Sequence, residues 1–137
     1  MSLPPPCAGI IVIDGEKTIL VSSKNDNYSF PKGKRNKGED TIDTAWRELT
    51  EETGLTKEHV EIIDGFVIDE TSNRGNIAMR YFVGRLIKNP TKLSYDAEEL
   101  NTVEWMKVTD ALKLEKFKNR RKDILKQAYE RALTIDN

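Results

Sequence analysis

The sequence predicts an α+β domain in which helices cover both faces of a mixed β-sheet. Short runs rich in β-branched and aromatic residues alternate with two segments that have the apolar spacing of helices. Their order along the chain is strands, helix, strands, helix, which favours one sheet with a helix on each face. With 137 residues, the chain has the length of one ordinary domain. We therefore predict a single domain over residues 1–137.

The strand predictions rest on apolar runs bounded by turn residues. The predicted strands are residues 8–14, 17–22, 28–30, 60–70, 76–87 and 102–108. The first two are joined by Asp14-Gly15, a pair typical of a hairpin turn. The third is stopped by Pro31, and a glycine-bounded basic loop is predicted at residues 32–38.

Three helices are predicted. The first spans residues 40–53 and ends before Gly54, a residue that commonly terminates helices. Its apolar stripe consists of Ile42, Ala45, Trp46 and Leu49. A short helix at 110–114 is predicted with Thr109 as its cap. The last helix carries the apolar positions Phe117, Ile124, Leu125, Ala128 and Ala132, and we predict that it packs on the sheet.

Composition excludes several classes of protein. The formal net charge is −1, which gives no reason to expect a nucleic-acid coat or a membrane surface. Cys7 is the one cysteine, so no intramolecular disulfide can form, and this suits a reducing compartment. No apolar run approaches the length of a membrane span. We expect a cytoplasmic protein with no membrane association, and no protein partner is evident.

The polar face of the predicted helix at 40–53 carries an unusual group of carboxylates. Glu48 and Glu52 are four residues apart and project from one face of a helix, and Glu51 lies beside them. Like charges this close repel each other, although Arg47 can pair with Glu51, four residues later. A hard divalent cation such as Mg²⁺ needs such a set of oxygen ligands and is often shared with a substrate phosphate.

The basic loop before this helix complements the carboxylates. It carries the cations Lys32, Lys34, Arg35 and Lys37. Gly33 allows the backbone to approach a phosphate closely, and the cations can neutralise phosphate charge. Carboxylates for a metal beside cations for phosphate favour hydrolysis at a polyphosphate, in which a metal ion polarises the phosphoryl oxygen and activates water.

These residues carry a resemblance to a known family. Starting from Gly33, the spacing to Glu39, to Arg47-Glu48-Leu49, to Glu51-Glu52 and to Gly54-Leu55 resembles the complete signature of the Nudix hydrolases, with all nine defined positions matched. The resemblance implies the Nudix fold, an α/β/α sandwich with a loop–helix–loop catalytic motif. It also implies that Glu48 and Glu52 bind Mg²⁺, or alternatively Mn²⁺, together with the carbonyl oxygen of Gly33.

The same resemblance implies roles for the neighbouring residues. Arg47 would orient Glu51, and Glu39 would be a further ligand or a structural hydrogen-bond acceptor. A general base often comes from a loop outside the signature, and here Glu98 is chosen narrowly over Glu99, with a glutamate of the signature as the alternative. The predicted catalytic residues are Arg47, Glu48, Glu51, Glu52 and Glu98. The predicted metal ligands are Gly33, Glu48, Glu52 and Glu98.

Substrate contacts are predicted from the basic loop and from one aromatic residue. Lys32 and Lys34 flank Gly33, and with Arg35 they are the predicted phosphate contacts. Tyr81 is the predicted base contact, because Arg80-Tyr81-Phe82 resembles the basic–aromatic strand of dinucleoside polyphosphate hydrolases in this family. Tyr28, Phe82 and Trp105 are further candidates for stacking, and all four aromatic residues, Tyr81 included, are of a type more often found in a core.

The sequence indicates the substrate class less directly than the reaction. The proline that follows the signature in ADP-ribose hydrolases is absent, as are the additional motifs of NADH and coenzyme A hydrolases. Residues 28–40 resemble both diadenosine polyphosphate hydrolases and mRNA-decapping enzymes. We expect a small nucleoside or dinucleoside polyphosphate such as diadenosine tetraphosphate. The alternatives are RNA as a capped substrate, an inositol pyrophosphate, a small dNTP-type substrate, and a non-catalytic nucleotide sensor.

Overall fold

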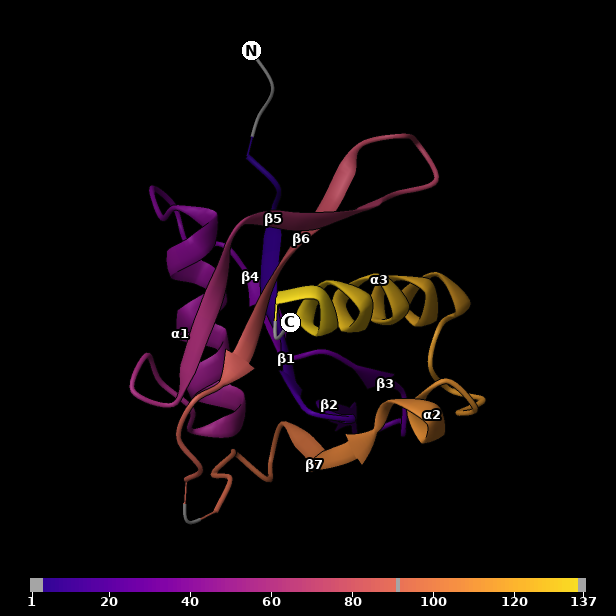
Figure 1. Ribbon diagram of the computed structural model, residues 1–137. Coiled ribbons are helices and arrows are strands. Elements are labelled where there is room, and N and C mark those ends of the chain that lie inside the picture. The colour runs from indigo at the N-terminus through magenta and orange to yellow at the C-terminus, as the bar shows by residue number, and fades with distance from the viewer. Residues whose placement is uncertain (1–3, 91, 136–137) are drawn as a thin grey trace.

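A mixed β-sheet lies between α1 and α3, as Figure 1 shows. The computed structural model describes residues 4–90 and 92–135. Its helices are α1 (Thr41–Thr53), α2 (Val108–Ala111) and α3 (Asn119–Ile135). Its strands are β1 (Cys7–Asp14), β2 (Lys17–Ser23), β3 (Tyr28–Ser29), β4 (Lys32–Lys34), β5 (Val60–Thr71), β6 (Ile77–Leu86) and β7 (Leu100–Lys107).

The sheet is mixed because β1 has parallel and antiparallel neighbours. It runs parallel to β6, with Ala8 opposite Arg80, and antiparallel to β2 and β4. The outer strand β5 pairs with β6, while β3 and β7 pair with β2. The predicted α+β class and mixed sheet are confirmed.

Two apolar clusters separate the layers, one on each face of the sheet. Successive side chains of a strand point to opposite faces, so β1 contributes alternate residues to each cluster. The cluster on the α1 side includes Ile10, Val12, Ala45 and Leu49. The cluster on the α3 side includes Ile11, Ile13, Leu125 and Ala128. Burial of these apolar side chains holds both helices against the sheet.

The segment from β4 to the end of α1 positions the candidate site. β4 pairs with the first half of β1, where Gly9 lies opposite Lys32 and Cys7 opposite Lys34. Part of the predicted basic loop is therefore a strand, fixed by main-chain pairing to the centre of the sheet. The helix ends at Gly54, whose φ of 82° and N–H bond to the Thr50 carbonyl make a left-handed cap.

Two helix boundaries differ from their predictions. The short helix begins at Val108, directly after β7, and Lys107 rather than Thr109 precedes its first turn. The last helix begins at Asn119, so Phe117 precedes it and fills the core with a 1% exposed side chain. No helix among the described residues is long and apolar enough to cross a bilayer.

Candidate active site

Two glutamates of α1 meet the main chain of β4. A Cβ at Gly33 would overlap the carboxylate of Glu48, so a larger residue there would displace the end of the Glu48 side chain. The main-chain N–H of Lys32 donates to Oε2 of Glu52 at 3.3 Å. The i,i+4 spacing on α1 thus brings both carboxylates to the same strand, as the sequence predicts.

Both carboxylates lie in surroundings that disfavour negative charge. Burial, and then the charge of Glu48, raise the pKa of Glu52 from 4.5 to about 8. Burial raises the pKa of Glu48 as well, with the charge of Glu51 as the next cause and Arg47 opposing them. Desolvated carboxylates that repel each other are stabilised by a cation between them.

The donor set fits a hard divalent cation that keeps part of its water shell. Among the described residues, no three or more His, Cys, Asp or Glu side chains are grouped as a metal site. Glu48 and Glu52 both meet β4 and would supply side-chain ligands, and water, a main-chain carbonyl or a substrate phosphate would complete the coordination. Mg²⁺ is typically bound in this way, through one or two carboxylates plus substrate phosphates.

Arg47 joins the helix to the loop that precedes it. Its Nε and Nη2 donate to the two carboxylate oxygens of Glu39 at 3.0 Å each, and Nη2 also donates to the Lys34 carbonyl at 2.8 Å. Its Nη1 donates to Glu48 at 3.0 Å and to Glu51 at 3.4 Å. The predicted contact with Glu51 is present, but Glu39 and Glu48 are the closer partners of this guanidinium.

Glu39 accepts hydrogen bonds from three directions. Besides Arg47, the Asn36 N–H donates at 3.0 Å and the Thr44 hydroxyl at 2.7 Å. These bonds, with Arg47 as the largest cause, lower the pKa of Glu39 to about 2. Of the two roles considered for Glu39, its contacts match the structural hydrogen-bond acceptor.

This geometry agrees with a known family. The NUDIX domain family model matches residues 3–128. The chain belongs to the NUDIX domain family. The resemblance seen in the sequence is confirmed, and so is the fold that it implies.

Curated relatives are similar to part of this chain. An RNA pyrophosphohydrolase of Roseobacter denitrificans is 37% identical over 62 residues, 42% of this chain and 39% of that protein. The one from Stenotrophomonas maltophilia is 38% identical over 60 residues, 42% of this chain and 29% of that protein. The matches thus span well under half the length of these curated relatives.

Solved NUDIX structures match over most of the chain. The binary complex of a C. elegans Ap4A hydrolase has a TM-score of 0.79 at 22% identity, covering 93% of this chain and 98% of that one. A MutT protein from Bacillus halodurans has a TM-score of 0.61 at 25% identity, covering 88% of this chain and 78% of that one. The NUDIX fold is therefore shared across nearly the whole described structure.

The structure contradicts one predicted substrate contact, Tyr81, and gives another, Arg35, partners within its own loop. Tyr81 is fully buried, its ring packs edge-on against Phe30 at 5.1 Å, and its hydroxyl donates to Glu70 at 3.3 Å. It cannot stack on a base, because the alternation along β6 turns it into the core. The Arg35 guanidinium donates to the carbonyl oxygens of Glu39 and Asn36, so it braces the loop.

The two lysines that flank Gly33 lie at the edge of the NUDIX carboxylate site. Lys32 is half-buried and Lys34 is exposed, on either side of the glycine that contacts Glu48. The positive charge of Lys32 also acts on Glu52, where it opposes the rise in pKa. Both lysines stay candidate phosphate contacts.

The loop before β7 presents two exposed glutamates. The N–H of Glu98 donates to Oδ1 of Asp96 at 2.9 Å within a turn. The charge of Glu99 is among the causes that raise the pKa of Glu48, which places Glu99 within electrostatic reach of the site. Glu98, the predicted base and metal ligand, and its neighbour Glu99 both stay candidates for the general base.

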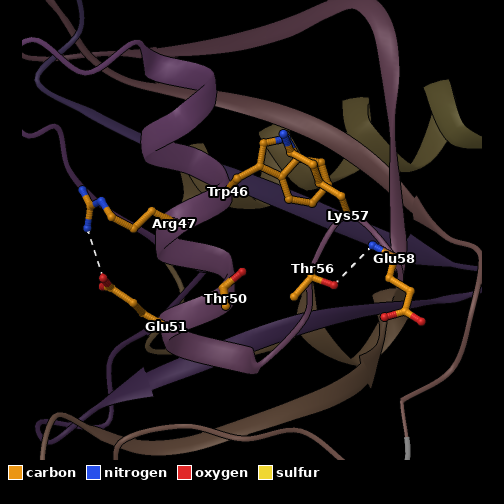
Figure 2. A pocket seen from close by; sticks show the side chains of 7 residues that line it. All are labelled: Trp46, Arg47, Thr50, Glu51, Thr56, Lys57 and Glu58. Carbon is orange, nitrogen blue, oxygen red and sulfur yellow. Dashed lines mark hydrogen bonds and ion pairs between the residues drawn. The ribbon is translucent and has the colours of Figure 1, made fainter.

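A shallow hollow of about 520 Å³ lies on the outer side of α1, and Figure 2 shows it. Arg47 and Glu51 point to one side of the helix there, and Trp46 points to the other. Trp46 is only partly buried, with the Lys57 ammonium 5.8 Å from its ring centre. Neither Glu48 nor Glu52 lines this hollow, so it lies outside the carboxylate pair.

Sequence reasoning missed a group of cations near the start of α3. Lys116, Lys118 and Arg121 line one pocket together with Lys32 of β4. They are more than eighty residues from Lys32, and no spacing rule connects them. The only signal in the sequence is their basic character, within and just before the segment predicted to be a packing helix.

Proposed function

We propose that this protein hydrolyses a diphosphate linkage in a nucleoside or dinucleoside polyphosphate, with a divalent cation, Mg²⁺ or Mn²⁺, held by Glu48 and Glu52. The observation that carries the proposal is the pair of desolvated carboxylates of Glu48 and Glu52, which pack against β4 at Gly33 and Lys32. Membership of the NUDIX family supports it, as do relatives named RNA pyrophosphohydrolase and a structural neighbour named Ap4A hydrolase.

Each residue of the site has a distinct part in this proposal. When bound, a divalent cation would polarise a phosphoryl oxygen and lower the pKa of a water molecule. Gly33 admits the Glu48 carboxylate, Arg47 holds it by a charge-assisted bond, and the Lys32 N–H holds Glu52. Such positioning is worth a large part of the barrier in phosphoryl chemistry.

The remaining charges would act on the substrate and on water. Lys32 and Lys34 flank Gly33 and would neutralise phosphate oxygens beside the carboxylate pair. A carboxylate outside α1 would accept the proton of the attacking water, and we assign this role to Glu99 in place of Glu98. Its charge acts on Glu48, which supports this choice.

A second candidate substrate is the 5′ end of an RNA. It is favoured by the curated relatives, which are named RNA pyrophosphohydrolases, and by the likeness of residues 28–40 to decapping enzymes. The net charge of −1 weighs against a long RNA footprint, because RNA affinity depends on phosphate neutralisation. A short 5′-terminal segment remains compatible with this charge.

The experiment is a substrate panel with product identification. Diadenosine polyphosphates, dNTPs, ADP-ribose, capped RNA, 5′-triphosphate RNA and an inositol pyrophosphate are incubated with Mg²⁺, with Mn²⁺ and with chelator. Running one set in ¹⁸O-water shows which phosphorus accepts the water oxygen. Metal-dependent release of mononucleotides from a dinucleoside polyphosphate supports the proposal, preference for RNA supports the second candidate, and nucleotide binding without turnover of any compound contradicts both.

A further inference from the structure

A pocket of about 260 Å³ lies between the strand β3 and the start of α3. Four of its lining residues are the cations Lys32, Lys116, Lys118 and Arg121, and no aspartate or glutamate lines it. Its other walls are hydroxyl, amide and aromatic side chains of the segment 23–29. The pocket therefore has the chemistry of an anion site, with hydrogen-bond donors around concentrated positive charge.

Most of this positive charge is not neutralised by the protein. Within the described ranges, Lys32, Lys116 and Lys118 form no ion pair with a carboxylate. The ammonium of Lys116 donates to the main-chain carbonyl of Asn25 at 3.4 Å. Only Arg121 has an acidic partner, the buried Glu70 at 3.1 Å. About three positive charges are thus available to a ligand.

The position of Lys116, Lys118 and Arg121 at and just before the start of α3 is unfavourable for the protein alone. Lys118 directly precedes the helix, Arg121 is its third residue, and the first turn contains no acidic residue. Cations at a helix N-terminus oppose the positive end of the helix dipole, and anions are favoured there. Glu70 offsets this effect for Arg120 and Arg121, whereas Lys116 and Lys118 have no such compensation.

The pocket adjoins the candidate metal site through one residue. Lys32 lines the pocket, and its N–H donates to the Glu52 carboxylate at 3.3 Å. Pockets that enclose a whole small ligand are usually about 300–1,000 Å³. A pocket of about 260 Å³ is therefore suited to one part of a substrate whose other part lies at the carboxylates.

We propose that this pocket, formed by Lys32, Lys116, Lys118 and Arg121, binds a second phosphate group of the substrate, away from the anhydride that is cut. The inference rests on the proposed function and deepens it, because it selects substrates with an extended run of phosphates over those with a single diphosphate. The phosphate has two possible sources, the polyphosphate chain of a dinucleotide or the backbone of an RNA 5′ end.

The kinetic test uses charge-matched variants. Lys116→Gln/Lys118→Gln removes two cations from the pocket, and Lys113→Gln/Lys126→Gln removes two exposed lysines outside it. Both are assayed on diadenosine diphosphate through hexaphosphate and on 5′-triphosphate RNAs of increasing length. For long phosphate chains we expect the pocket variant to raise KM about tenfold or more, with kcat nearly unchanged and diadenosine diphosphate unaffected.

A binding measurement separates this inference from the proposed function. Inorganic tripolyphosphate is titrated into the metal-free protein by calorimetry, at low and at high salt. We expect salt-sensitive binding that weakens in the pocket variant and not in the control variant. This result would support the pocket even if no compound of the panel is turned over, which would instead contradict the proposed function.

The kinetic outcomes assign the source of the phosphate or overturn the inference. A KM effect that depends on phosphate number in dinucleotides identifies the polyphosphate chain. An effect confined to RNA, growing with the first nucleotides, identifies the RNA backbone. If the pocket and control variants have equal KM values on every substrate and equal affinity for tripolyphosphate, the pocket binds no phosphate.

Discussion

Replacing Glu52 with glutamine should stabilise the metal-free protein while it removes activity. Burial and the charge of Glu48 raise the pKa of Glu52 from 4.5 to about 8. A carboxyl group with a raised folded-state pKa binds its proton more tightly in the folded protein than in the unfolded chain. The stability that this contributes is complete below the unfolded pKa of 4.5 and is lost as the pH rises from there through the folded pKa of about 8. At pH 7 that loss is about 3 kcal/mol, from ~1.4 kcal/mol per pH unit.

Glutamine has nearly the same shape and no charge, so it avoids this loss. For a domain of this size, about 3 kcal/mol corresponds to a rise of roughly 10 °C in Tm. The gain should be small at pH 5, because this pH lies only about half a unit above the unfolded pKa of 4.5, and it should reach its full size above pH 8. Turnover should fall by a factor on the order of 10² or more, as for the loss of a main electrostatic group.

The assay is thermal unfolding of chelator-treated protein from pH 5 to pH 9, followed by circular dichroism, with turnover measured on the same samples. Glu130→Gln, which changes an exposed glutamate of α3, is the matched control and should leave Tm and turnover unchanged. Added Mg²⁺ should raise the Tm of the wild type and have little effect on Glu52→Gln, because a ligand stabilises only the state that binds it.

Two results would refute this reasoning at different points. If Glu52→Gln melts no higher than the wild type at pH 8 without metal, the Glu52 carboxylate carries no penalty for burial. If the variant keeps near-full activity at saturating Mg²⁺, Glu52 is not a metal ligand. The first result concerns the electrostatics of the folded protein and the second concerns its chemistry.

Three further predictions concern the same site. Gly33→Ala should stay folded by circular dichroism, but its kcat should fall on the order of 10²-fold, because its Cβ displaces the end of the Glu48 side chain. An unchanged kcat would show that activity does not require the Glu48 carboxylate to lie against Gly33. Because the pKa of Glu39 is lowered to about 2, its stabilising contribution is present above pH 4.5 and is lost as the pH falls toward 2. Urea unfolding of Glu39→Gln should show a flatter acid dependence than the wild type, and an identical slope would contradict the pairing. Glu99→Gln should reduce kcat more than Glu98→Gln and change the acidic limb of the pH profile, and the opposite order would favour Glu98 as the base.

Local spacing was sufficient for the parts of the site that lie on one helix. Glu48 and Glu52 share a face because α-helical periodicity brings residues i and i+4 together in any context. Leu49 and Ala45 enter the core for the same reason, and Gly54 ends the helix because it tolerates the left-handed conformation. The NUDIX signature records this geometry, so the family and the carboxylate pair could be identified without coordinates.

The surroundings of other predicted site residues depend on how distant segments pack. Tyr81 is directed into the core by the register of β6 against β1 and by the ring of Phe30. Arg35 donates to main-chain carbonyls of its own loop, and its predicted phosphate contact stays a prediction. The choice between Glu98 and Glu99 depends on the path of the loop before β7, because adjacent residues of a loop differ only in direction.

The sequence by itself determined the family, the order of the elements and the pair of carboxylates, because these follow from periodicity and from a fixed spacing within one segment. Only the tertiary structure decided where the other cations gather. Lys32 on β4 meets Lys116, Lys118 and Arg121 because α3 packs across the sheet and its first turn is tied to β5 through Glu70. Contacts between segments that far apart are fixed by burial and pairing in the folded chain, and no local pattern encodes them.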